Sequence, residues 1–125
     1  MVLVDSSVWV GFLQSGGETS LVQLLGLNEV LVHDMVLGEV AMGSDQQRQK
    51  AFAFLPLLPS MRVADHEEVM RLVDKHQLYG SGVGYVDAHL LTAAVLQPGT
   101  LLWTRDKRLG KAAGLLGIAF EAFAH

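Results

Sequence analysis

The sequence has no cysteine, only three prolines, and few aromatic residues, which make up 7% of its 125 positions. Without cysteine the chain can form neither disulfide bonds nor thiolate metal sites. It lacks an apolar run of the roughly 18 residues that a membrane-spanning helix needs. No basic segment precedes the first apolar run, so we do not expect a signal peptide. These absences favour a cytoplasmic protein without a membrane partner.

What remains is the composition of a folded domain. Half of the residues are apolar and the mean hydropathy is +0.34, which argues against disorder. A length of 125 residues suits one domain of ordinary size, so we predict a single domain over residues 1–125. The net charge of −4, taken as a sum, argues against a nucleic-acid partner. The basic residues are nevertheless concentrated in one short stretch, which contains Arg105, Lys107, Arg108 and Lys111.

Short apolar runs alternate with stretches of helical pattern. We expect strands at Val2–Val4, Val30–Val32, Arg62–Ala64, Thr100–Trp103 and Gly117–Phe120. Helices are expected at Val8–Leu13, Glu18–Leu27, Met35–Met42, Gln46–Leu55, Asp65–Leu78, Val86–Leu96 and Lys107–Leu115. Continuous apolar strands that alternate with helices indicate a parallel sheet covered on both faces. We therefore predict an α/β fold in three layers, α/β/α, with a central parallel sheet of four to five strands.

Two acids have the sequence positions of helix caps. Asp34 precedes the expected helix Met35–Met42, and Asp65 precedes a helix whose third residue is Glu68. An acid followed three residues later by glutamate is the signature of a capping box. We therefore expect Asp34 and Asp65 to be the N-caps of their helices.

Four other acids lie at positions where a parallel α/β fold can bring functional side chains together. Asp5 directly follows the first expected strand, and Asp106 follows the strand Thr100–Trp103. Active sites of parallel α/β sheets lie beyond the carboxyl ends of the strands. Glu39 lies on a mostly apolar helix, and Asp87 opens the apolar helix DAHLLTAAVL. Two strand ends and two helices can thus each bring one acid to a common site.

Each of these acids alone also has an ordinary structural explanation. Asp87 can face the helix dipole from the first turn, Asp5 and Asp106 can begin turns, and Glu39 can be an exposed helix residue. Four carboxylates in one place, however, would repel one another without a cation. A set of oxygen ligands favours Mg²⁺, with Mn²⁺ as a plausible substitute. Beside such a metal, the basic stretch near Asp106 can bind a polyanion.

At these residues the chain resembles PIN-domain ribonucleases, and more closely the VapC-like toxins of toxin–antitoxin pairs. The resemblance is carried in order by VLVDSSVWV, VLGEVAM, GYVDAHLLTAA and LLWTRDKRLGKAA. It implies a PIN-like domain in which Asp5, Glu39, Asp87 and Asp106 form an acidic metal site for Mg²⁺ or Mn²⁺. It also implies endonucleolytic cleavage of RNA, a cognate VapB-like antitoxin and a homodimer.

The resemblance also assigns supporting residues. Ser6 matches a small hydroxyl residue that often follows the first acid, and Thr104 matches a threonine or serine two places before the last one. We expect both hydroxyl side chains to orient the acids without binding the metal themselves. The basic stretch is expected to contact RNA through Arg105, Lys107, Arg108 and Lys111, which is an interpretation of its charge and not of the resemblance.

Other functions remain open at this stage. A metal-free ribonuclease would need a pair of histidines, but His33 and His89 show no convergent spacing. An aspartate nucleophile of the haloacid-dehalogenase type would need a second aspartate where Ser7 stands. The chain can also be a PIN nuclease of RNA processing, or a protein-binding α/β domain without catalysis. The apolar stretch Phe52–Leu58 is explained equally well by a dimer interface or by core packing.

Overall fold

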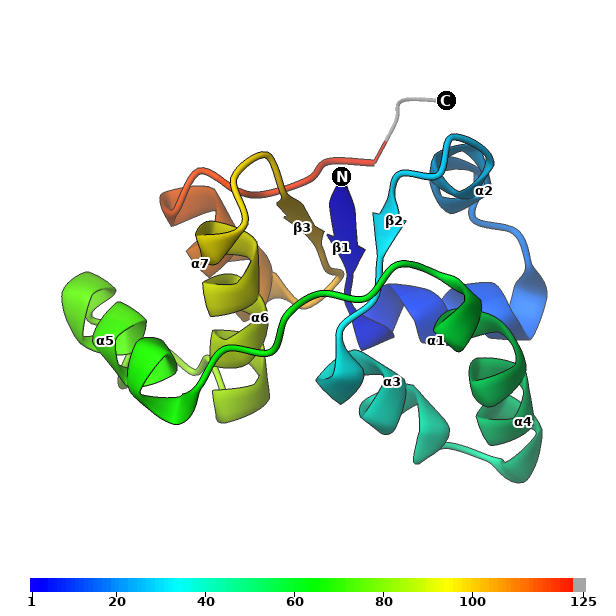
Figure 1. Cartoon of the computed structure of the whole chain (residues 1–125), viewed down its shortest axis with the longest axis horizontal. Helices are drawn as coiled ribbons and strands as arrows, with labels where there is room; N and C mark the ends of the chain where they lie inside the picture. The colour runs from blue at the N-terminus through cyan, green and yellow to red at the C-terminus, as the bar shows by residue number, and fades with distance from the viewer. Residues whose placement is uncertain (123–125) are drawn as a thin grey trace.

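The computed structural model describes residues 1–122, so the last three residues of the predicted 1–125 domain lie outside the described residues. Three parallel strands, β1 (Val2–Val4), β2 (Val30–Leu31) and β3 (Leu101–Trp103), form a sheet in the order β2-β1-β3. Figure 1 shows this sheet at the centre of the molecule, with helices on both sides. The predicted α/β fold with a parallel central sheet is confirmed.

The helices form two groups about the sheet. The first group lies on the side of β2 and contains α1 (Ser6–Ser15), α2 (Thr19–Gly26), α3 (Asp34–Ala41), α4 (Asp45–Phe54) and the short 3₁₀ helix η1 (Leu55–Leu57). The second group lies on the side of β3 and contains α5 (His66–His76), α6 (Tyr85–Leu96) and α7 (Lys107–Leu115). No helix within residues 1–122 is both long and apolar enough to cross a membrane.

The sheet has fewer full strands than the four to five we expected. Within residues 1–122, the chain beyond β2 pairs in parallel only at Ser60 with Val32, and beyond β3 only at Ala119 with Leu102. The expected strand Arg62–Ala64 is wrong, because the contact with the sheet is made by the Pro59 carbonyl and the Met61 amide. Proline has no N–H to extend that ladder. The expected strand Gly117–Phe120 is reduced to one bridge in the same way.

The core lies against both faces of the central strand. All three residues of β1 are buried, and Leu3 and Val4 have no exposed surface. Since neighbouring residues of a strand point to opposite faces, burial of all three shows that helices cover both faces. Trp9 of α1 is also fully buried, with its ring edge-on to Phe12 and Phe54.

The apolar stretch that follows Ala51 divides between core and surface. Leu55 is fully buried, and Phe54 and Leu58 pack against the core. Phe52 and Leu57 are 50% and 79% exposed. Core packing therefore explains Phe54, Leu55 and Leu58, and a dimer interface at the exposed residues stays a prediction.

The two expected helix caps have different outcomes. Asp65 forms the capping box with Glu68 that the sequence predicts. The cap of α3 is His33 and not Asp34, because the buried Nδ1 of His33 accepts a 3.0 Å hydrogen bond from the Met35 amide. Asp34 is instead the first residue of the helix. Neither helix-capping propensity nor residue spacing indicates that His33 is the cap. Burial of its ring, which depends on distant parts of the chain, holds it in this position.

We expect Asp65→Ala to lower the free energy of unfolding by about 1 kcal/mol, because it removes the 2.8 Å hydrogen bond from the Glu68 amide. The melting temperature would fall by about 3–6 °C, measured by circular dichroism. Asp65→Ser keeps a side-chain acceptor and should melt close to the parent. Equal melting of all three proteins would contradict a stabilising cap.

Candidate active site

Asp5 is the most enclosed of the four acids. It follows β1 directly and is 4% exposed. Its amide donates a 2.9 Å hydrogen bond to the Trp103 carbonyl, so the backbone ties the ends of β1 and β3 together at this point. Oxygen Oδ2 of Asp5 accepts hydrogen bonds from Ser7 Oγ at 2.9 Å and Thr104 Oγ1 at 2.7 Å. A buried carboxylate with this many fixed donors has a defined orientation.

Ser7 is a supporting residue that the sequence analysis did not identify. Besides donating to Asp5, its Oγ accepts a 3.0 Å hydrogen bond from the Arg105 amide. Thr104 acts in the same manner, since its hydroxyl accepts a 3.0 Å hydrogen bond from the Asp106 amide. These two hydroxyls therefore hold the loop after β3 against Asp5. The one sequence signal for Ser7 was its position next to Ser6, directly behind the first acid.

Glu39 approaches the same place from α3. Ser6 Oγ lies 3.2 Å from Glu39 Oε1 and 3.3 Å from Asp5 Oδ1, so one hydroxyl bridges the two acids. The side chain of Glu39 is largely exposed, but its carboxyl group loses part of its hydration against the protein. This partial desolvation raises the pKa of Glu39; the Ser6 hydrogen bond opposes the rise, and the charge of Asp5 adds to it.

Asp87 shows most directly that the four acids act on one another. It is the third residue of α6, one helical turn from the N-cap Gly84. Burial, followed by the charges of Asp5, Asp106 and Glu39, raises the pKa of Asp87 from 3.8 to about 6. Like charges destabilise an ionised carboxylate only when they are near. The fold thus brings together acids from β1, α3, α6 and the end of β3.

Asp106 has two roles in the geometry. Its Oδ1 accepts a 2.9 Å hydrogen bond from the Leu109 amide, which caps α7. Asp106 is exposed, and its charge nevertheless adds to the rise in the pKa of Asp87. The sequence offered Asp106 as an acid that begins a turn, whereas the structure uses one of its oxygens to cap a helix. The other oxygen has no hydrogen bond within residues 1–122.

The donor set fits a hard divalent cation. All four groups are carboxylates, and within residues 1–122 none of them forms an ion pair with a lysine or arginine. No three acid, histidine or cysteine side chains of that part of the chain stand close enough to hold a metal as they are placed. Like charges repel one another, so carboxylates gathered in one region favour the binding of a cation. Oxygen ligands of this kind suit Mg²⁺ or Mn²⁺.

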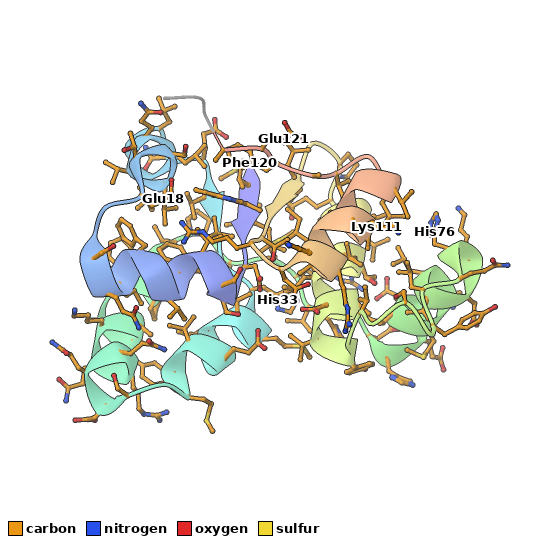
Figure 2. All side chains as sticks on the ribbon, turned by 180° about the vertical axis from the view of Figure 1, so that it is seen from behind. Glu18, His33, His76, Lys111, Phe120 and Glu121 are labelled. Atoms are coloured by element: carbon orange, nitrogen blue, oxygen red, sulfur yellow. The ribbon has the colours of Figure 1, made fainter. Side chains whose placement is uncertain are left out.

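The basic stretch separates into two parts. Arg105 forms an ion pair with Glu18, just before α2, and is therefore already engaged. Lys107 and Lys111 are exposed on α7, where Figure 2 shows Lys111, and neither pairs with an acid of the described residues. Arg108, also exposed, extends toward the loop at Gly82. Three of the four predicted RNA-contacting residues thus remain available to an anion.

The histidines do not form a catalytic pair. The rings of His33 and His89 are buried, with centroids 6.3 Å apart. His33 Nε2 and His89 Nδ1 have no hydrogen-bond partner within the described residues. Burial lowers the pKa of both rings, assisted by His89 at His33 and by His66 at His89. Both rings therefore favour the neutral form, which suits their buried positions.

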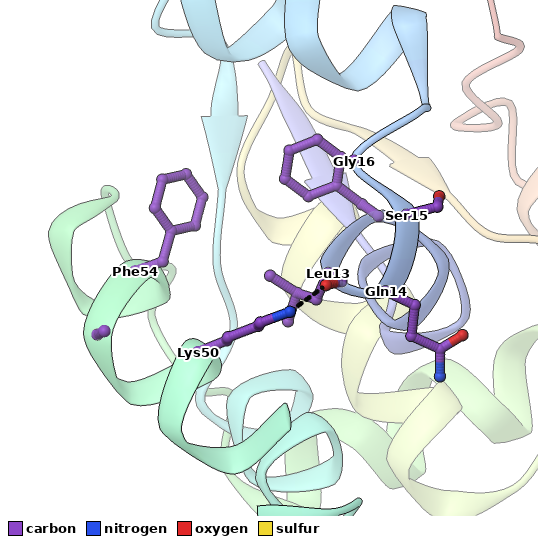
Figure 3. A pocket seen from close by; sticks show the side chains of 8 residues that line it. Leu13, Gln14, Ser15, Gly16, Lys50 and Phe54 are labelled. Atoms are coloured by element: carbon purple, nitrogen blue, oxygen red, sulfur yellow. Dashed lines mark hydrogen bonds between the residues drawn. The ribbon is translucent and has the colours of Figure 1, made fainter. Parts of the chain in front are cut away.

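A cavity of about 520 Å³ lies away from the acids, at the far end of α1. Figure 3 shows it between α1 and α4, with Phe54 and Lys50 on one side and Leu13 to Gly16 on the other. The Lys50 ammonium donates a 3.0 Å hydrogen bond to the Leu13 carbonyl. Lys50 is the one ionisable side chain in the lining. The cavity therefore offers no paired groups for acid–base or metal chemistry.

A parallel sheet between helical layers, with acids gathered at the carboxyl ends of its strands, defines an α/β domain with an acidic candidate metal site. The family model described as "PIN domain" matches residues 2–115. The chain belongs to the PIN domain family.

The relatives agree with this assignment. The chain is 44% identical over 119 residues to the curated protein "Ribonuclease VapC32" of Mycobacterium tuberculosis, in strains CDC 1551 / Oshkosh and ATCC 25618 / H37Rv, and the match covers 95% of each chain. Among solved structures, the crystal structure of PAE2754 from Pyrobaculum aerophilum superposes with a TM-score of 0.62 and 17% identity. That match covers 88% of this chain and 82% of the other, and it supports the fold alone. The resemblance to VapC-like PIN-domain ribonucleases is confirmed.

Proposed function

We propose that this chain is a metal-dependent endoribonuclease and the toxin of a VapBC-like toxin–antitoxin module. The observation that carries the proposal is the gathering of carboxylates at the carboxyl edge of the sheet. Ser6 Oγ lies 3.3 Å from Asp5 Oδ1 and 3.2 Å from Glu39 Oε1, and the charges of Asp5, Asp106 and Glu39 add to the rise in the pKa of Asp87. Membership of the PIN domain family and the name of the relative "Ribonuclease VapC32" support the same reaction. Hydrolysis of RNA phosphodiesters is the activity that joins these observations.

In this proposal Asp5 and Asp87 are the principal metal ligands, with Glu39 and Asp106 beside them. A bound Mg²⁺ or Mn²⁺ supplies Lewis-acid stabilisation of the phosphate and a lowered pKa of water. The hydroxyls of Ser6, Ser7 and Thr104 hold Asp5 in one orientation, as their hydrogen bonds indicate. Attack by water leaves a 5′-phosphate and a 3′-hydroxyl, whereas attack by the RNA 2′-hydroxyl would leave a cyclic phosphate.

The substrate and partner follow from the same proposal. Exposed cations on α7 attract the phosphates of RNA toward the acids. The affinity for RNA should therefore fall strongly as the salt concentration rises. These cations are Lys107, Arg108 and Lys111. The partner is a cognate VapB-like antitoxin, because the curated relatives carry the VapC name. A homodimer and a cytoplasmic location stay predictions of the sequence.

The test is to incubate antitoxin-free protein with total cellular RNA and to sequence the new 5′ ends. Parallel reactions contain Mg²⁺, Mn²⁺ or a chelator, and Asp5→Asn is the matched variant. We expect discrete cuts with 5′-phosphates that require both metal and Asp5. Cuts that persist in chelator, or cyclic-phosphate ends, would contradict the mechanism. Absence of both cleavage and metal binding would favour the protein-binding domain without catalysis.

Thr104→Val should lower kcat/KM by roughly tenfold, in the range typical for residues that orient metal ligands. The substitution removes the 2.7 Å hydrogen bond to Asp5 Oδ2 and the 3.0 Å bond from the Asp106 amide. Thr104→Ser keeps the hydroxyl and should retain most of the rate. The measurement is the initial rate of cleavage of one RNA at several metal concentrations. A fully active valine variant would show that Asp5 needs no such support.

A further inference from the structure

Tyr85, the first residue of α6, has a ring that is both fixed and accessible. Its phenol oxygen shares a 2.8 Å hydrogen bond with His66 Nδ1 of α5. Its ring stands edge-on to buried His89, with centroids 4.8 Å apart and an interplanar angle of 87°. The residue is nevertheless 46% exposed. An aromatic ring held from two sides with a free surface loses little conformational entropy when another flat ring stacks on it.

A cavity of about 200 Å³ borders this ring. It lies between α5 and α6 and is closed by the glycine-rich loop that precedes α6. Tyr79, 65% exposed, lines it together with Tyr85, and the other lining includes Val83 and Met70. No acid or base is part of this lining. The cavity therefore suits a flat, largely apolar group between aromatic side chains.

The cavity and the acidic site lie on different faces of the first turn of α6. Tyr85 and Ala88, three residues apart, line the cavity, whereas Asp87 between them does not. Residues two apart on a helix point in different directions, so the Asp87 carboxylate points away from Tyr85. A base in the cavity and a phosphate at the acids would therefore belong to different nucleotides of one strand.

Positive charge joins the cavity to α7. The Cβ of an alanine at Gly82 would lie 2.6 Å from Arg108 Cδ and 3.0 Å from Arg108 NH1, so the arginine side chain crosses the loop there. Gly82 also has a φ of +89°, a conformation that favours glycine. Arg108 thus lies next to the loop that closes the cavity, on the same helix as Lys107 and Lys111. A chain with flat bases and a phosphate backbone complements this combination of apolar cavity and cationic border.

We propose that Tyr85 and its cavity bind an unpaired nucleobase of the RNA whose scissile phosphate lies at the acids. Tyr85 is the stacking residue, and Arg108 neutralises the backbone next to it. This inference rests on the proposed ribonuclease function, which it deepens by assigning a base-binding site to α6. Stacking on an aromatic side chain accepts every base to some degree, since each base has a π-face.

The test measures binding separately from cleavage. In an Asp5→Asn background, fluorescence anisotropy follows a fluorescein-labelled oligouridine dodecamer and an abasic dodecamer of equal length. Tyr85→Leu should weaken binding of oligouridine by about tenfold, and Tyr85→Phe, which keeps the ring, should stay within about twofold. Binding of the abasic probe should be the same in all three proteins. Equal effects of Tyr85→Leu on both probes would reveal a merely structural role and overturn the proposal.

A second measurement needs no variant. A 5-iodouridine dodecamer is crosslinked by light to the unmodified chain, and the adduct is mapped by mass spectrometry. We expect adducts at Tyr85 or Tyr79, and adducts confined to other residues would overturn the proposal. Metal-dependent cleavage without base-dependent binding at Tyr85 would support the ribonuclease function and contradict this base-binding site. Base-dependent binding without cleavage of any RNA would support the base-binding site and contradict the ribonuclease function.

Discussion

Asp5→Asn is expected to reduce metal-dependent RNA cleavage by at least about a hundredfold, since even residues that only orient metal ligands contribute 10–100-fold. The substitution keeps the shape of the side chain and removes its charge. It also places an amide where the hydroxyls of Ser7 and Thr104 now donate hydrogen bonds to Oδ2. Since Asp5 is 4% exposed, water cannot easily replace the lost ligand.

The measurement combines cleavage rates with thermal melting in Mg²⁺, Mn²⁺ and chelator. The parent should be stabilised by either metal, because a ligand that binds the folded state alone raises its stability. Asp5→Asn should lose most of this gain. Asp34→Asn is the matched control, because Asp34 is an exposed acid at the start of α3 that forms no ion pair within residues 1–122. Retained cleavage in Asp5→Asn, or equal loss in Asp34→Asn, would contradict the assignment.

Asp87→Asn is expected to stabilise the metal-free protein while abolishing cleavage. Burial and the charges of three acids raise the pKa of Asp87 from 3.8 to about 6. At pH 7 the folded state must therefore hold an unfavourable ionised carboxylate, which asparagine removes. The half-exposed position and the favourable helix dipole reduce the gain, which we place at about 1–2 kcal/mol.

The effect of Asp87 on stability depends on pH in a defined direction. A carboxyl whose pKa is higher in the folded state favours folding at low pH, and this contribution is lost as pH rises through the folded value. The parent should therefore lose stability relative to Asp87→Asn between about pH 4 and pH 6–7, the window between the pKa of 3.8 and that of about 6. Below pH 4 the two proteins should melt alike.

Denaturant unfolding of both proteins in chelator, from pH 4 to pH 8, measures this difference. With Mg²⁺ added at pH 7 the order should reverse, because the parent gains stability from the metal and the variant gains little. Asp74→Asn, an exposed acid on α5, is the control for a general change in charge. A difference between parent and Asp87→Asn that is constant with pH would show that the four acids do not interact as their positions indicate.

The order and direction of the elements could be read from the chain itself. Val2–Val4 is apolar at every position, and such a run predicts a strand covered on both faces because its pattern is local. Asp5 directly after this run, and Asp106 after β3, were predicted at the carboxyl edge of the sheet by the same reasoning. The Asp65 capping box was likewise predictable, since its two partners are three residues apart.

Only the tertiary structure decided the features that depend on distant parts of the chain. The outer strands became single bridges, and at the bridge beside β2 Pro59 offers no N–H to extend the ladder. Asp5 is supported by Thr104, 99 residues away, and Ser6 joins it to Glu39 of α3, which is 33 residues from Ser6. Arg105 was expected to bind RNA, but the fold places it against Glu18. The sequence by itself determined which chemical groups lie at the strand ends, because local patterns define strands and helices. Packing decided which of these groups meet and which ion pairs form, because those contacts join residues that no local pattern relates.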